Sequence, residues 1–450
     1  MNYVPHTPED IRRALLAIGV ESVDELFADL PQSLQKPELD IPEGLDEVSL
    51  LRHLRGLAAK NKAPRATFLG GGLRQHFIPS VTPHLAMQGE FVTAYTPYQP
   101  EVSQGMLQAT FEYQTMMSEL TGLPVSNASL YDGASAVAEA ALLAVRQTGR
   151  RKVVVSAGVH PESREVLATY VRPQGIEVYE VALEELTTPN ADAVVMEGAA
   201  CLIVQNPNFL GYLEAMPVLA AAAHTAGALF VAVCDPLTLA VLTAPGEYGA
   251  DIAVGDGQTV GNPVNFGGPH FGFMVVAEPL LRQLPGRIVG ETTDRDGRRA
   301  FVLTLQAREQ HIRRSKAKSN ICSNHQLTAL MAAVNLAALG PQGLAEVATK
   351  SVQNAHTLAG RLAEAGLEPL TSKPFFNEFV VRTPVSAPEL RRALAEHGID
   401  AAVPVPETFG LGNAALFAAT ELTTEEDMAL LTEALKPVLT DERVLEAAHD

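Results

Sequence analysis

The feature that most constrains this chain is a series of short, continuous runs of Val, Ile and other apolar residues in its middle third. Segments long enough for helices separate these runs. Short strands that are apolar throughout, rather than alternating with polar residues, are typical of a parallel sheet covered by helices on both faces. The pattern therefore predicts an α/β fold with a mostly parallel sheet. The predicted strands are Val153–Ala157, Ile176–Val181, Cys201–Gln205, Leu229–Cys234, Ile252–Val254 and Phe271–Val276.

The length of 450 residues and the change of pattern along the chain predict three parts. Residues 1–65 are expected to form a helical arm, in which Thr7 caps a helix, Pro8 begins it and Gly19 ends it. Residues 66–330 are expected to form the large α/β domain. Ala- and Leu-rich helices with a strand around "NEFVVRT" then predict a smaller α/β domain over residues 331–450.

Charge and composition exclude several classes of function. The formal net charge of −19 leaves no basic face for a nucleic acid or an anionic membrane. The N-terminus has no signal-peptide pattern, and no apolar run reaches the ~18 residues of a membrane span. Cys201, Cys234 and Cys322 are far apart with no metal-ligand spacing, which predicts reduced thiols, no metal site and a cytoplasmic location.

Two short motifs could hold an anionic ring cofactor. Gly133, Ala134 and Ser135 in "YDGASAVAEA" place free N–H groups at a helix start, where a phosphate is stabilised. Asp235 directly follows the strand "LFVAVC", where a carboxylate could hold a protonated pyridine nitrogen. Close packing is the more common reason for small residues at a helix start, and a helix cap or a turn before Pro236 is the alternative for Asp235.

These features together resemble the fold-type I pyridoxal-phosphate enzymes, and longer blocks narrow the resemblance. "FVTAYTPYQPEVSQGMLQATFEYQTMMSELTGLPVSNASLYDGASAVAEA", "NFGGPHFGF" and "RRSKAKSNICSN" are similar to the N-terminal half of the glycine cleavage system P-protein, which in many bacteria is a separate subunit 1. The resemblance implies a large domain like that of the fold-type I pyridoxal-phosphate-dependent transferases, followed by a smaller C-terminal α/β domain.

The loop that should carry the cofactor lysine has none. Gln258 and Thr259 stand where the family's catalytic half has a His-Lys pair, and no lysine occurs between Lys152 and Lys316. Because neither Gln nor Thr can form a Schiff base, the resemblance implies an α subunit whose β partner, subunit 2, holds pyridoxal 5'-phosphate covalently.

The family's reaction sets the expected partners. The α and β subunits, expected as α2β2, would decarboxylate glycine as the cofactor's aldimine and pass the aminomethyl group to the lipoamide of H-protein. Two alternatives stay open at this point. The chain could be a purely structural or regulatory subunit, or an independent enzyme that uses Lys316 or Lys318.

Two short stretches are the candidates for contributing to the partner's site. In "AYTPYQPE", prolines stiffen the loop that presents Tyr95, Tyr98 and Gln99, which are interpreted as a wall around the glycine carboxylate. Ser319 and Asn320 could donate hydrogen bonds to the phosphate of the partner's cofactor. A packing loop and a helix N-cap are the corresponding structural alternatives.

Other polar residues have weaker interpretations. The basic run from Arg298 to Lys318 is either a solvated face or a region that steers a phosphate or receives an acidic lipoyl carrier. His160 and His270 are interpreted as core histidines in preference to remnants of a ring-stacking site.

Overall fold

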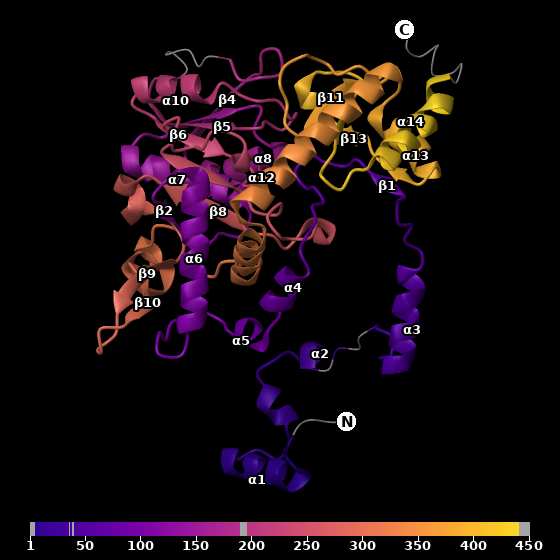
Figure 1. Cartoon of the computed structure of the whole chain (residues 1–450). Helices are drawn as coiled ribbons and strands as arrows, with labels where there is room; N and C mark the ends of the chain where they lie inside the picture. Colours follow the sequence, from indigo (N-terminus) through magenta and orange to yellow (C-terminus); the bar gives the residue numbers. More distant parts are fainter. Residues whose placement is uncertain (1–4, 36, 38–39, 190–195, 441–450) are drawn as a thin grey trace. The chain divides into compact units, whose positions relative to one another are not determined.

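The computed structural model describes residues 5–35, 37, 40–189 and 196–440, and the chain divides into two compact units, Met1–Lys62 and Ala63–Asp450 (Figure 1). The first unit is helical, with α1 (Pro8–Ile18), η1 (Asp24–Phe27), α2 (Gln32–Gln35) and α3 (Glu47–Ala58). Thr7 caps α1 by accepting a hydrogen bond from the Asp10 N–H, Pro8 is its first residue, and Gly19 ends it in the left-handed conformation. The predicted boundaries of this helix are confirmed.

A seven-stranded sheet forms the centre of the second unit, with the order β2-β8-β7-β6-β5-β3-β4. The strands β3 to β7 are mutually parallel, whereas β8 is antiparallel to both β7 and β2. The strands are β2 (Val125–Ser126), β3 (Lys152–Ser156), β4 (Glu177–Val181), β5 (Ala199–Gln205), β6 (Leu229–Val233), β7 (Ile252–Asp256) and β8 (Gly272–Val276). The mostly parallel sheet expected from the apolar runs is confirmed.

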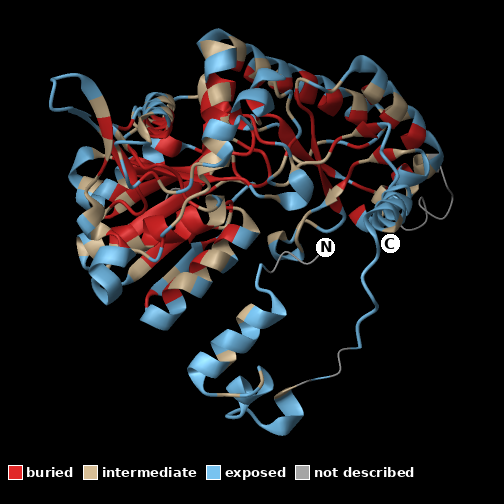
Figure 2. Cartoon of the chain, turned by 90° about the horizontal axis from the view of Figure 1, so that it is seen from below, coloured by how far each residue is buried: buried red, intermediate tan, exposed pale blue. Residues whose placement is uncertain are grey.

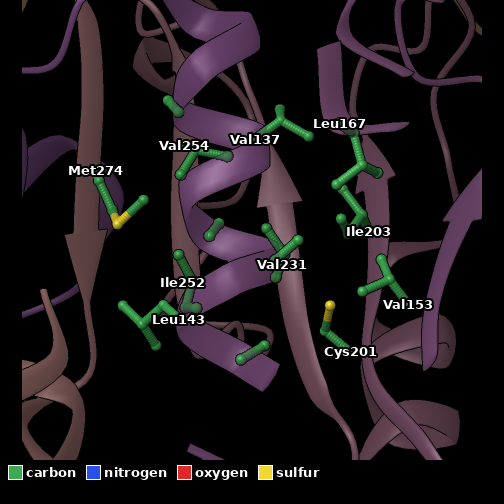
Figure 3. Packing of buried hydrophobic residues seen from close by; sticks show 14 of the residues in the cluster. Val137, Leu143, Val153, Leu167, Cys201, Ile203, Val231, Ile252, Val254 and Met274 are labelled. Carbon is green, nitrogen blue, oxygen red and sulfur yellow. The ribbon is translucent and has the colours of Figure 1, made fainter. Parts of the chain in front are cut away.

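Helices cover both faces of this sheet. The helices α7 (Gly133–Thr148) and α8 (Pro161–Val171) pack on one face, and Figure 3 shows Val137 and Leu143 of α7 beside Val254 and Ile252 of β7. The other face is covered by α6 (Gln104–Thr121), α10 (Met216–Thr225) and the first part of α12 (Gln326–Glu364). Figure 2 shows the resulting continuous buried layer. Each fully buried Val or Leu contributes about 1.5–3 kcal/mol.

A second, antiparallel sheet lies in the C-terminal part of the chain, with the order β11-β14-β13. Its strands are β11 (Glu378–Arg382), β13 (Val403–Pro404) and β14 (Ala414–Ala418), and α13 (Ala387–Glu396) and α14 (Glu425–Thr440) pack against it with the end of α12. The short strand β1 (Ala66–Thr67) pairs in parallel with β12 (Ile399–Asp400). The boundary proposed at residue 330 stays a prediction, and α12 runs across it.

The remaining elements lie between the sheets and at the surface. They are α4 (Val81–Ala86), α5 (Gly89–Val92), the hairpin β9 (Ile288–Thr293) and β10 (Arg299–Thr304), α11 (Gln310–Arg313), and the 3-10 turns η2 (Arg172–Gln174), η3 (Thr238–Ala240), η4 (Asn265–Gly267), η5 (Glu278–Gln283), η6 (Gln306–Arg308), η7 (Arg314–Lys316) and η8 (Glu407–Phe409).

Within the described residues, α12 alone is long and apolar enough to cross a membrane. It is a core helix: Ala332 and Leu336 pack with the large sheet, and Leu358 and Leu362 pack with the small one. Gly340 interrupts it with φ 63° and ψ 179°, so α12 consists of two helical segments joined at a kink. The apolar composition of α12 is therefore explained by its packing against both the large and the small sheet.

Candidate functional site

A cavity of about 650 Å³ opens at the carboxyl ends of the parallel strands. This is the edge at which ligands bind in open α/β sheets, because strand ends and helix starts converge there. Asp235 follows β6, Asp256 ends β7, and Gly133 begins α7. The motifs singled out in the sequence are thus brought together at one place. The lining includes residues 70–74, Asp132, Gly133, Ala134, His160, Glu162, Asp235, Asp256, Gln258, Thr259, His270, Asn377 and Glu378.

Arg74 is the central charged residue of this cavity. Its guanidinium is about one-tenth exposed and forms ion pairs with Asp235 and, at 2.6 Å, with Glu378 of β11. Burial by itself would lower the pKa of the Arg74 guanidinium, but the Glu378 and Asp235 carboxylates raise it above its ordinary value. The side chain is therefore permanently charged, and its charge is neutralised inside the protein.

The Gln258 side chain holds the backbone of Arg74. Its Oε1 atom accepts a hydrogen bond from the Arg74 N–H at 3.1 Å, and its Nε2 atom donates to the Arg74 carbonyl at 2.8 Å. Gln258 is 2% exposed. Gln258 and Thr259 stand where the family's His-Lys pair was expected. Gln258 binds the Arg74 backbone, and the Thr259 hydroxyl donates a hydrogen bond to Asp235.

Both oxygens of Asp235 are engaged by this chain. Oδ1 accepts hydrogen bonds from the Thr259 hydroxyl and, at 3.0 Å, from the Leu237 N–H, while Oδ2 pairs with Arg74. The turn interpretation of Asp235 is confirmed by the bond to Leu237. A pyridine nitrogen would have to displace Arg74 or Thr259 to reach this carboxylate.

The start of α7 is also occupied internally. The Gly133 N–H donates to Asp256 Oδ2 at 3.1 Å, and the Ser135 N–H donates to the capping Asp132 at 2.7 Å. Asp256 Oδ1 further accepts from the Gln258 N–H at 2.9 Å. Burial raises the pKa of the Asp256 carboxyl, while the nearby His270 ring and these N–H donors oppose that rise. A carboxylate therefore lies where a cofactor phosphate would bind.

These residues do not fit pyridoxal phosphate. The residues that line the cavity, all of them described, include no lysine for a Schiff base. The carboxylate suited to the ring nitrogen is paired with Arg74, and the helix start suited to the phosphate is paired with Asp256. Lys316 and Lys318 are exposed and lie outside the lining, which disfavours an independent enzyme that uses them.

The two histidines are wall residues of the cavity. His160 caps the start of α8, and its Nε2 atom lies 2.9 Å from the Gly71 carbonyl oxygen. His270 is buried, with Nδ1 3.6 Å from Asp256 Oδ1. The core interpretation agrees with the burial of His270, whereas His160 is only partly buried, and both residues line the cavity.

The loop with Tyr95, Tyr98 and Gln99 lies at the surface, outside the cavity lining. Tyr95 is 80% exposed, and its hydroxyl lies 3.3 Å from Ser323 Oγ. The Arg287 guanidinium lies over the Tyr98 ring at 5.5 Å from its centroid. Gln99 is exposed.

The predicted stretch around Ser319 and Asn320 comes close to this loop. Ser319 Oγ accepts a hydrogen bond from the Ile321 N–H at 3.0 Å, and Asn320 is exposed. The alternative of a helix N-cap is wrong, because α12 starts only at Gln326. The contact between Tyr95 and Ser323 joins the two predicted stretches in one surface, which we call the tyrosine face. It consists of Tyr95, Tyr98, Gln99, Ser319, Asn320, Ser323 and Asn324, and the buried Arg287 contacts Tyr98 and Asn324 from within.

Sequence reasoning missed three charged residues that organise the structure. Neither Arg74 nor Glu378 was singled out as a site residue, although Glu378 lies in the predicted strand "NEFVVRT", and only the fold brings them to Asp235. Arg287 contacts both Tyr98 and Asn324, with Nη1 3.3 Å from Asn324 Oδ1. The basic run was treated as one surface, yet Arg308 is partly buried and donates to the Gly286 carbonyl at 3.1 Å.

Comparison with known proteins decides the family. The glycine cleavage system P-protein family model matches residues 1–435. The "Probable glycine dehydrogenase (decarboxylating) subunit 1" of Moorella thermoacetica is 50% identical over 98% of this chain and 100% of its own length. The chain belongs to the glycine cleavage system P-protein family. The protein of the same description from Carboxydothermus hydrogenoformans is 49% identical over 97% of this chain and 99% of its own length.

Solved structures agree with this membership. A crystal structure of glycine decarboxylase (P-protein), in inhibitor-bound form, matches with a TM-score of 0.91 and 58% identity over 98% of this chain and 100% of that one. A cysteine desulfurase from Thermococcus onnurineus matches with a TM-score of 0.61 at 15% identity, over 83% of this chain and 94% of that one, which shows the fold alone. The predicted fold type I is thereby confirmed, and within the P-protein family the chain is of the subunit 1 type.

Proposed function

We propose that this chain is the cofactor-free α subunit of glycine decarboxylase and that its partner, subunit 2, holds pyridoxal phosphate. The pair decarboxylates glycine and passes the aminomethyl group to the lipoyl group of H-protein. The observation that carries the proposal is the pairing at the expected lysine position, where Thr259 and Arg74 both bind Asp235. The names of the relatives, which refer to a subunit 1, support a second subunit.

The tyrosine face is the part of this chain that we assign to the partner's site. The phenols of Tyr95 and Tyr98 are hydrogen-bond donors, which suits the carboxylate of glycine, and the buried Arg287 donates to the Tyr98 hydroxyl. Ser319 and Asn320 are assigned to the phosphate of the partner's cofactor. Prolines on either side of Tyr98 hold the loop, so that binding costs little ordering entropy.

The deciding experiment is borohydride reduction followed by peptide mapping, on this chain alone and on the chain coexpressed with subunit 2. Exchange of glycine carboxyl with bicarbonate is measured on the same samples. We expect the pyridoxyl label on a lysine of subunit 2, and exchange only in the pair. A label on a lysine of this chain when it is alone would refute the assignment.

A further inference from the structure

The cavity at the carboxyl edge of the sheet is crossed by the chain's own segment Gly70–Arg74. The Gly71 N–H donates to Glu378 Oε1 at 2.7 Å, so this segment is bonded to β11 through both backbone and side chain. A Cβ atom at Gly70 would lie 2.0 Å from the same oxygen, and one at Gly72 would lie 2.9 Å from His160 Nε2. The glycines therefore permit an approach that a larger residue would prevent.

This segment places the charged Arg74 side chain beside Asp235, the carboxylate that could bind the cofactor's pyridine ring. The Arg74 guanidinium lies between Asp235 at the edge of the large sheet and Glu378 at the start of the small one. The amide of Gln258 fixes the backbone on either side of it. Arg74 thus supplies the positive partner that a protonated pyridine nitrogen would supply to Asp235.

At the end of the neighbouring strand β7, the cavity contains a second acidic side chain. Asp256 accepts the Gly133 N–H at the start of α7, in the place that suits a phosphate. A Cβ atom at Gly133 would lie 2.9 Å from the Asp256 Cβ, so the helix start and this side chain are in close contact. The two groups that could bind the cofactor are therefore already occupied. Asp235 is bound by a positive side chain in place of the ring nitrogen, and the Gly133 N–H is bound by an acidic side chain in place of the phosphate.

We propose that this cavity is a self-filled cofactor site, in which Arg74 replaces the ring nitrogen and Asp256 replaces the phosphate of pyridoxal phosphate. The chain excludes the cofactor by occupying its binding groups, in addition to lacking the lysine. The Arg74 ion pairs also hold β11 to the edge of the large sheet. The inference rests on the proposed function in one respect: the proposed function assigns pyridoxal phosphate to subunit 2.

The first test restores the lysine in the isolated full-length chain. Thr259→Lys places an amine beside Asp235 but leaves both groups occupied. A second variant adds Arg74→Met, Glu378→Gln and Asp256→Ala, which removes the ion pair from Asp235 and the hydrogen-bond acceptor from the Gly133 N–H. After pyridoxal phosphate and borohydride, we expect the label at residue 259 to rise by about tenfold or more in the second variant, because the competing charges are gone.

A matched control combines Thr259→Lys with Arg361→Met, which removes an arginine from a surface ion pair with Glu425. This control should label like Thr259→Lys alone. If the Thr259→Lys chain and the second variant label equally at residue 259, whether strongly or not at all, the proposal is overturned. A label on the wild-type chain would instead count against the proposed function, so the two failures are distinguishable.

A second measurement does not depend on the cofactor. Arg74→Met leaves two carboxylates without their cation and should lower the melting temperature by several degrees, since breaking a buried pair is strongly destabilising. Adding Glu378→Gln should recover part of that loss, whereas Arg361→Met should change the melting temperature little. An Arg74→Met chain that melts like the wild type would overturn the structural half of the proposal.

Discussion

At the scale of single residues, the two tyrosine hydroxyls test whether the chain takes part in chemistry or only supports its partner. Replacement of Tyr95 and Tyr98 by Phe removes both phenol donors and keeps the rings. We expect glycine–bicarbonate exchange by the complex to fall by about tenfold, the effect of losing a hydrogen bond to a charged group. The measurement is kcat and KM for glycine, together with the mass of the complex.

A structural role for these residues makes a different prediction. If the double Phe variant assembles normally and keeps full turnover, the tyrosine face plays no part in the reaction. Gln108→Ala serves as a matched control, because Gln108 is exposed on α6 and bonds only to Glu112 on the same helix among the contacts seen here. That variant should leave both the exchange rate and the assembly unchanged.

The residues of the cavity show how far a sequence can predict a site. Asp235 follows a strand and Gly133 opens a helix. Because strand ends and helix starts meet at this edge of the sheet, both residues could be placed at the cavity from the sequence. Arg74 carried no such signal, because its ion-pair partners lie 161 and 304 residues away in the chain. The lysine-free loop was visible, but its filling by Gln258, Thr259 and Arg74 depends on tertiary contacts alone.

At the scale of elements, Glu421 links three segments through its carboxylate. It accepts a hydrogen bond from the Phe77 N–H at 2.6 Å, lies 2.7 Å from His76 Nδ1, and bonds the Ser351 hydroxyl of α12 at 3.2 Å. Burial would raise the pKa of the Glu421 carboxyl, but His76 and the N–H donors outweigh it and hold the pKa below 4.5.

The sign of the pH effect follows from this lowered pKa. Stability from Glu421 is fully present above its unfolded pKa of 4.5 and is lost as the pH falls through the lower folded value. Urea unfolding at a series of pH values should therefore show a smaller loss of stability below pH 4.5 in Glu421→Gln than in the wild type. Parallel curves for the two proteins would contradict the linkage.

The kink in α12 depends on one glycine. Gly340 has φ 63° and ψ 179°, a conformation that is essentially restricted to glycine, although a Cβ atom there would meet nothing within 4 Å. Gly340→Ala should lower the free energy of unfolding by about 1–3 kcal/mol through backbone strain. Gly360 in the same helix is the matched control: Gly360→Ala, also in open space, should raise it by about 0.5–1 kcal/mol.

The elements themselves were largely predictable, and the exceptions have a physical reason. Five apolar runs predicted β3 and β5 to β8, because burial on both faces demands uninterrupted apolar sequence. The edge strand β4 was predicted too, although Glu177 and Glu180 interrupt it and most of its residues are exposed. The two-residue strand β2 is too short to leave a pattern. Strand β10 of the β9–β10 hairpin lies within the basic run, which suggested a solvated surface. Burial of its Phe301 and Leu303 depends on contacts with α6.

At the scale of the whole molecule, exposed apolar side chains between residues 77 and 102 indicate an interface. This stretch, which we call the α4–α5 face, includes Phe77, Val81, Leu85, Met87, Val92 and Val102. Several exposed apolar side chains within one short stretch are typical of a surface that another protein covers. The stretch also leads into Tyr95 and Tyr98, so its partner is expected to be the subunit that the tyrosine face completes.

Assembly can be tested on this face with charged substitutions. Chains of 48.0 kDa coexpressed with subunit 2 should elute as one complex with the mass of α2β2. Met87→Asp combined with Val102→Asp would place two carboxylates in an apolar contact, so we expect dissociation at concentrations where the wild type stays assembled. Val218→Asp on the exposed side of α10 is the control, because Val218 is comparably exposed outside the α4–α5 face. If the wild-type subunits elute separately, the expected α2β2 state is refuted. If Val218→Asp dissociates the complex as readily as the double variant does, the interface lies on another surface.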